Sequence, residues 1–196
     1  MKFFKKYFTS KPEKYTENAD NSLEENQRQL PIDEFFVSNF VNKGGKFFYP
    51  ENMDDFKSEL IKLQGYLKID HFSVWERSYL HFLEKLKVPV KYGFEKNDVF
   101  LGGCESLIAE EGAIMTTGEH TGEFRNADLP KKRVIIAMSS QILSNKTQAL
   151  SDINRRHDHP PSNIQTISVF AQPDNDLMGK LWFETYLFLI ENQADE

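Results

Sequence analysis

GGCESLIAEEGAIMTTGEHTGEFRNADLP, residues 102–130, is the stretch of sequence on which the fold prediction depends. It places ionisable side chains beside short apolar runs, with glycines where the chain turns. Ser106 opens an apolar run, Gly112 can adopt the positive φ of a tight turn, and Ala113 resumes extended, β-prone chain. With a side-chain period of two, Glu110 and Glu111 point to opposite faces, so at most one of them faces a given cleft.

Helix and strand patterns alternate on both sides of this stretch. Four helices are predicted, beginning at Pro31, at Asn52 or Asp54, at Ser73, and at Ser139 or Ser140. Strands are predicted at residues 46–49, 88–92, 99–101, 133–138, 164–170 and 181–190, with a helix or turn near residues 174–179. This alternation predicts a three-layer α/β fold, with a mainly parallel sheet and helices on both faces.

Length and composition limit the classes of protein to consider. The 196 residues fit one domain at 31–196, and the polar segment 1–30 favours a flexible tail over a weak membrane contact. A net charge of −6 argues against nucleic acid, and the single cysteine excludes an internal disulfide or a thiolate metal site. No apolar run could cross a bilayer, so a cytoplasmic protein is expected. Neither a cofactor nor a metal is expected.

Several segments together resemble the LUD domain, the bacterial lactate-utilisation proteins of the LutC type. Residues 108–113, IAEEGA, are similar to the family's IAETGT, and Arg125 precedes Leu129 and Pro130 as an Arg precedes Leu-Pro in the family. The helix, glycine, strand and helix order of residues 40–60 is also similar, as is the terminal LIEN at 189–192. The resemblance implies the fold of the ribose-phosphate isomerase and CoA-transferase group.

One loop departs from the family pattern. Family members carry ISGPSRTADI after the penultimate strand, where this chain has ISVFAQPDND at residues 167–176. Ser168 keeps the first serine, but Val169 replaces the glycine and Gln172 replaces the arginine. Glutamine cannot hold a carboxylate or phosphate as the bidentate guanidinium does. Either the ligand differs from that of the family or this chain has lost the family's chemistry.

The candidate site residues follow from the pattern of residues 102–130 and from the resemblance. Glu110 and His120 are the catalytic candidates, although a surface loop would also explain His120. The substrate-binding candidates are Glu111, Gly112, Arg125 and Ser168, with Arg125 as either an anion clamp or a surface ion pair. Cys104 is expected to be a small buried hydrophobe, and His157 and His159 are expected in a solvated turn rather than in a metal site.

Two functions remain at this point. The resemblance implies an accessory component of L-lactate oxidation to pyruvate, which works with iron–sulfur and oxidoreductase partner proteins. The alternative is a stand-alone enzyme of the isomerase and CoA-transferase group, in which Glu110 reacts and Arg125 holds a small anionic metabolite. Either function is compatible with a homo-oligomer. Both place the ligand beyond the carboxyl ends of the strands.

Overall fold

The computed structural model describes residues 30–167 and 183–191, which form two β-sheets with helices packed around them. The elements in chain order are α2 (Ile32–Asn42), β1 (Lys46–Phe48), α3 (Met53–Leu67), β2 (Phe72–Val74), α4 (Arg77–Lys85), β3 (Val90–Tyr92), β4 (Val99–Gly102), β5 (Ser106–Ile108), β6 (Ala113–Thr116), α5 (Gly118–Thr121), β7 (Lys132–Met138), the 3-10 turn η2 (Ser139–Gln141), β8 (Ile142–Leu143), α6 (Lys146–Arg156), β9 (Gln165–Ile167) and β10 (Glu184–Ile190). Every helix in these two ranges is too short or too polar to cross a bilayer.

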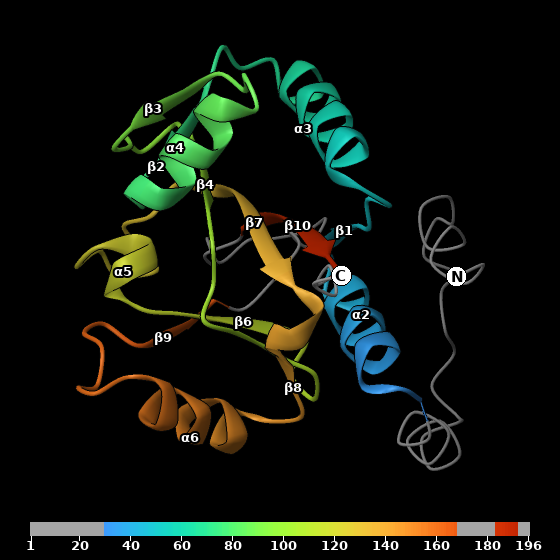
Figure 1. The fold of residues 1–196 in the computed structure, drawn as a ribbon, viewed down its shortest axis with the longest axis vertical. Helices are drawn as coiled ribbons and strands as arrows, with labels where there is room; N and C mark the ends of the chain where they lie inside the picture. Colours follow the sequence, from blue (N-terminus) through green and yellow to red (C-terminus); the bar gives the residue numbers. More distant parts are fainter. Residues whose placement is uncertain (1–29, 168–182, 192–196) are drawn as a thin grey trace, which may run out of the picture.

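The larger sheet confirms the predicted fold class. Its six strands lie in the order β1-β10-β7-β4-β2-β3, and every neighbouring pair is parallel. The smaller sheet has the order β8-β5-β6-β9 and is mixed. Figure 1 shows the layers, with α3 and α4 above the larger sheet, the smaller sheet and α2 below it, and α6 beneath the smaller sheet.

Two apolar cores lie on the two faces of the larger sheet. Because side chains alternate along a strand, Val134 and Ile136 of β7 pack with α3 and α4, while Ile135 and Ala137 pack against α2 and the smaller sheet. A third, smaller core joins α6 to the smaller sheet. Both faces of the larger sheet are therefore covered, as its continuous apolar strands predict.

The first two helices begin and end as predicted. Pro31 precedes α2, and Gly44, with a φ of 91°, follows its end. Asn52 caps α3 by accepting a hydrogen bond from the backbone N–H of Asp55 at 2.9 Å. The buried stripe of α3 includes Phe56 and Leu60, as predicted. Ile61, the residue after Leu60, lies outside this buried stripe and is 43% exposed.

Two predicted helix starts are wrong: Ser73 lies in a short buried strand, and Ser139 and Ser140 lie in the 3-10 turn η2, which leads into the short strand β8. Ser73 lies inside β2 and donates its hydroxyl to Asp98 at 2.9 Å, so α4 begins only at Arg77. Ile142 and Leu143 form β8, and Asn145 caps α6 in place of Ser139 or Ser140. Strands of two or three residues are too short for their apolar side chains to reveal a period.

Residues 102–130 include β5 and β6, the two middle strands of the smaller sheet. β5 and β6 pair antiparallel, and Gly112 in their connection has the predicted positive φ, 50°. β8 and β9 flank this hairpin. Residues 1–29 of the tail predicted at 1–30, and the helix or turn predicted near residues 174–179, lie outside the described residues.

Candidate functional site

The order of the strands predicts a ligand site at the carboxyl ends of β2 and β4. These neighbours are parallel, but the chain leaves β2 through α4 toward β3 on one side and leaves β4 through the hairpin and α5 toward β7 on the other. In open α/β sheets such a reversal of direction leaves a crevice in which ligands bind. The segments that reach this end are residues 75–76, residues 103–105 and α5.

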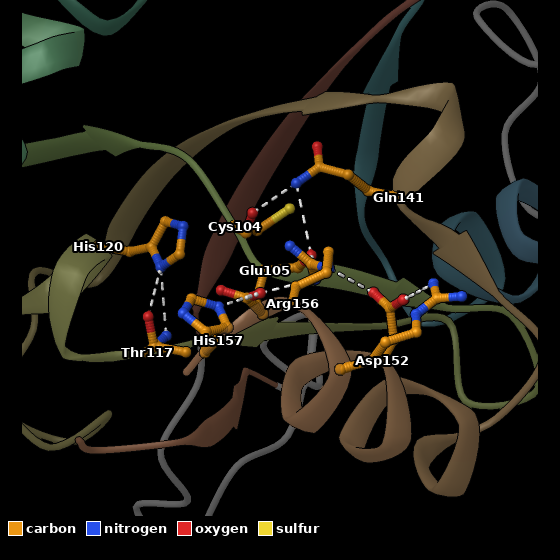
Figure 2. A network of polar contacts seen from close by, with 9 residues as sticks. Cys104, Glu105, Thr117, His120, Gln141, Asp152, Arg156 and His157 are labelled. Atoms are coloured by element: carbon orange, nitrogen blue, oxygen red, sulfur yellow. Dashed lines mark hydrogen bonds and ion pairs between the residues drawn. The ribbon is translucent and has the colours of Figure 1, made fainter. Parts of the chain in front are cut away.

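Glu105 is the buried acid at this end of the sheet. Its side chain is 4% exposed, and its Oε1 lies 2.6 Å from Arg156 Nη2 and 3.1 Å from His157 Nε2. The backbone N–H of Glu105 donates to Met115 O at 2.8 Å, which holds the residue at the entrance of β5. Figure 2 shows the Glu105 carboxylate beside the Arg156 and His157 side chains, which come from the end of α6.

Arg156 joins this carboxylate to a second one. Its Nε lies 2.6 Å from Oδ2 of Asp152, one turn earlier on α6, and its side chain is 43% exposed. Burial acts to raise the pKa of Asp152, but hydrogen bonds from Arg156 and Arg155 outweigh burial and lower that pKa. The Nη1 of Arg156 makes no hydrogen bond or ion pair with any residue in the described ranges, so it can still donate to a ligand.

His120 lies on α5 at the same end of the sheet and is 9% exposed. Its Nδ1 accepts a hydrogen bond from the backbone N–H of Thr117 at 3.3 Å and lies 3.0 Å from Thr117 Oγ1 (Figure 2). Burial lowers the pKa of His120, although the carboxylates of Glu76, Glu105 and Glu119 act to raise it. His120 is therefore a neutral imidazole, and the acceptor role of Nδ1 leaves its proton on Nε2.

Three further groups lie at this end of the sheet. Oε2 of Glu76 is buried and has no hydrogen-bond partner among residues 30–167 and 183–191. A Cβ at Gly103 would lie 2.7 Å from the ring of Tyr79, so glycine lets this ring approach the end of β4. Burial raises the pKa of the Cys104 thiol, and Glu105 raises it further, so Cys104 is the inert buried residue that the sequence predicts.

The structure does not bring the predicted residues Glu110 and Arg125 together. Glu110 is exposed, in a turn that Asn39 of α2 holds by donating to Ala109 O at 2.8 Å. Arg125 follows α5, beyond the other end of β6, where its side chain is 82% exposed and 3.0 Å from Asp128. The next residue, Asn126, is bonded to Gln165, which pairs with the last residue of β6. The predicted common mouth for Glu110 and Arg125 is therefore wrong.

The other predicted residues divide between these two places. Glu111 and Gly112 lie in the turn against α2, where a Cβ at Gly112 would meet the backbone of Asn39 at 2.5 Å. The backbone oxygen of Glu111 accepts a hydrogen bond from Lys43. Of the candidates that lie in the described residues, only His120 lies beside the Glu105 network. Ser168, with Val169 and Gln172 of the divergent loop, lies outside the described residues.

Sequence reasoning missed the residues that complete the site. Arg156 and His157 were assigned to a solvated loop, yet Arg156 ends α6 and the His157 side chain is only 22% exposed. The i, i+4 spacing of Asp152 and Arg156 was the one available signal, since it predicts an ion pair on a helix. No group of three or more His, Cys, Asp or Glu side chains that could hold a metal occurs within residues 30–167 and 183–191.

Arg133 was also missed, because the strand that it opens was interpreted as a continuous apolar run. Arg133 is 0% exposed; its Nε donates to Pro130 O at 2.8 Å and its Nη2 to Asn126 O at 2.7 Å. Its guanidinium lies 3.7 Å from the centre of the Phe183 ring. Burial lowers the pKa of Arg133 to about 9. These contacts attach residues 126–130 to β7 at the amino end of the sheet, away from the crevice.

Comparison with known proteins supports the fold. No family model matches the sequence, and no curated protein matches it. The crystal structure of a DUF162 family protein from Deinococcus radiodurans is similar, with a TM-score of 0.59 and 11% sequence identity over 82% of this chain and 96% of that one. DUF162 is the LUD domain family. The chain therefore has a LUD-like fold.

Proposed function

We propose that this chain is a LUD-type binding domain that holds a small anionic metabolite at the carboxyl ends of β2 and β4. We further propose that it serves the oxidation of L-lactate to pyruvate in the cytoplasm, as an accessory component beside iron–sulfur and oxidoreductase partner proteins. The sequence similarity at residues 108–113 and the likeness to the DUF162 structure support this assignment. A small carboxylate is the chemical class of ligand that follows from it.

The observation that carries the proposal is the half-exposed Arg156 beside the buried Glu105. Arg156 uses Nε and Nη2 for carboxylates of the chain and leaves Nη1 directed to none of the described residues. His157 lies on the same carboxylate and can donate a second hydrogen bond when protonated. A guanidinium held in place by two carboxylates presents its remaining N–H groups to an anion with little loss of side-chain entropy.

The geometry favours binding over catalysis. The Glu105 carboxylate is already engaged by Arg156 and His157, and burial keeps the Cys104 thiol protonated, so neither group is a ready nucleophile. The alternative enzyme, with Glu110 and Arg125 as its reacting and binding groups, requires two residues that lie at opposite ends of β6. His120 remains the one buried group at this end that could move a proton, and it has no substrate atom to act on until a ligand binds.

Ligand binding is tested by isothermal titration calorimetry with L-lactate and with pyruvate. Arg156→Gln is expected to weaken binding about tenfold or more, because a hydrogen bond to a charged group is worth about 1.5–3 kcal/mol. Arg155→Gln is the matched control: Arg155 is the adjacent residue of α6, and its polar contact within residues 30–167 and 183–191 is with Asp152. Equal effects of the two substitutions, or no binding by the unaltered protein, would contradict the binding site.

The accessory role is tested by assaying electron transfer from L-lactate to an artificial acceptor. The purified protein alone is expected to show no turnover, and turnover is expected when cysteine-rich iron–sulfur partners are added. Turnover by the protein alone would contradict the accessory role. The stand-alone enzyme is tested separately with an acyl-CoA or a sugar phosphate, where Glu110→Gln is expected to abolish activity if Glu110 is the reacting group. Circular dichroism of each variant verifies that the fold is retained.

A further inference from the structure

One short segment, residues 157–163, connects the two parts of the proposed site, and it is called the strap below. It begins where α6 ends, at His157, whose Nε2 lies 3.1 Å from Glu105 Oε1, and it leads into β9. Along its length it contacts α5, the helix that carries His120. Figure 1 shows this link between α6 and β9 on the side of the molecule where α5 lies.

The strap holds both ends of α5 by hydrogen bonds. At the start of the helix, the backbone N–H of Gly118 donates to Ser162 O at 2.8 Å. Just past its end, Asn163 Nδ2 donates to Gly122 O at 2.8 Å and to Phe124 O at 2.9 Å. Gly118 and Ser162 lie so close that a Cβ at position 118 would be 2.4 Å from Ser162 Oγ. The strap and α5 are therefore in direct contact at both ends of the helix.

The helix α5 depends on such contacts because it is only one turn long. A helix of four residues bears the cost of nucleation with almost no further backbone hydrogen bonds, so it is not stable by itself. Its end also has carbonyl groups without a helical donor, and the amide of Asn163 supplies one to Gly122 O. Trp75 packs against the same end, where a Cβ at Gly122 would lie 2.7 Å from the ring. The position of α5 is therefore set by its neighbours.

The backbone of the strap suits it to this role. Asn163 has a φ of 52°, a left-handed conformation that asparagine adopts more readily than most residues. Pro160 and Pro161 fix two further φ angles, which reduces the number of conformations open to the segment. A segment with few alternative conformations keeps α5 at a fixed position relative to the end of α6.

We propose that Asn163 is a positioning residue of the site, which acts on the ligand through His120. The inference rests on the proposed function, in which Arg156 holds a small carboxylate. Nδ1 of His120 accepts a hydrogen bond from Thr117, and Nε2 has no partner among residues 30–167 and 183–191, so its N–H is free for a ligand. With α5 held in place, this N–H donates to the hydroxyl oxygen of L-lactate while Nη1 of Arg156 donates to the carboxylate.

Asn163→Gly separates the side-chain amide from the backbone conformation. Glycine adopts a φ of 52° without strain, so the substitution removes the hydrogen bonds to Gly122 and Phe124 and leaves the turn allowed. Asn163→Asp is a second variant, because it keeps the shape of the side chain but cannot donate. Lys68→Gly is the matched control: Lys68 is exposed, has a φ of 53° and ends α3, which packs on the other face of the larger sheet.

The first measurement is the titration of the His120 imidazole by nuclear magnetic resonance, without a ligand. Both substitutions of Asn163 are expected to raise the pKa of His120 toward its ordinary value of about 6.5 and to populate its second tautomer. The reason is that a loosened α5 exposes the ring and weakens its hydrogen bond to Thr117. An unchanged pKa and tautomer in both variants, or an equal change in Lys68→Gly, would overturn the proposal.

The second measurement is isothermal titration calorimetry with L-lactate. Asn163→Gly is expected to weaken binding about tenfold, and Lys68→Gly is expected to leave it unchanged. Equal affinity of Asn163→Gly and the unaltered protein would overturn the positioning role while leaving the Arg156 site intact. No binding by the unaltered protein would instead contradict the proposed function, and the His120 titration would then decide whether Asn163 positions the imidazole.

Discussion

Two glutamates within residues 102–130 have different roles, because one is buried and the other is exposed. Glu105 is 4% exposed and contacts Arg156 and His157 at the end of α6, whereas Glu110, five positions later, is exposed at a turn. A buried carboxylate requires its partners, because the charge has lost the water that would otherwise solvate it. An exposed carboxylate gains little from any single neighbour.

Glu105→Gln is therefore expected to destabilise the protein far more than Glu110→Gln. Loss of the buried charge leaves Arg156 and His157 without their shared partner, at an expected cost of about 2–3 kcal/mol, reduced because Arg156 is half-exposed. Glu110→Gln is expected to change the free energy of unfolding by less than about 0.5 kcal/mol. Urea unfolding at neutral pH measures both values. Similar values for the two variants would contradict the buried network.

His120 is expected to make stability depend on pH near neutrality. Its pKa is lowered by burial in the folded protein, so the unfolded chain, with an ordinary pKa of about 6.5, takes up the proton first as the pH falls. Unfolding is therefore favoured below about pH 6.5, and this contribution is restored as the pH rises.

The pH dependence is measured by urea unfolding between about pH 7 and pH 5.5. His120→Gln is expected to reduce the loss of stability over this interval, because the amide can accept the Thr117 hydrogen bond without titrating. His81→Gln is the control, since the His81 side chain is 69% exposed. An unchanged slope in His120→Gln would show that the histidine is not buried as described.

At the scale of the elements, glycine has opposite effects in a turn and in a helix. Gly112→Ala is expected to cost about 2–4 kcal/mol, since it combines a φ of 50° with a Cβ 2.5 Å from the backbone of Asn39. Gly65→Ala is expected to stabilise the protein by about 0.5–1 kcal/mol, because this position of α3 has nothing within 4 Å of a new Cβ. Thermal or urea unfolding gives both signs, and a tolerated Gly112→Ala would contradict the packing of the turn on α2.

The elements that the sequence predicted correctly are those with local signals. Pro31 and Asn52 mark the starts of helices, and the predicted turn at Gly112 has the required φ. The errors fall where a strand of two or three residues is decided by its neighbours: Ser73 in β2 is held between two other strands, and Ile142 pairs with β5. Tertiary pairing overrides local propensity in such short segments.

For the whole molecule, the fold class followed from the alternation of elements, but the site did not. The contact between Glu105 and His157 joins residues 52 positions apart, and it forms only because α6 packs beneath the hairpin. No local pattern encodes that contact. A sequence argument could identify ionisable residues near the carboxyl ends of strands, as it did for His120, but it could not determine that the turn at Glu110 points toward α2, away from that end.

The most direct test of the central claim is a titration of isotopically labelled protein with L-lactate, followed by nuclear magnetic resonance of the backbone amides. The account predicts saturable shifts that are largest at Glu105, His120, Arg156 and His157, at the carboxyl ends of β2 and β4. Shifts centred instead on Glu110, Gly112 or Arg125, or no saturable shift at any amide, would contradict it.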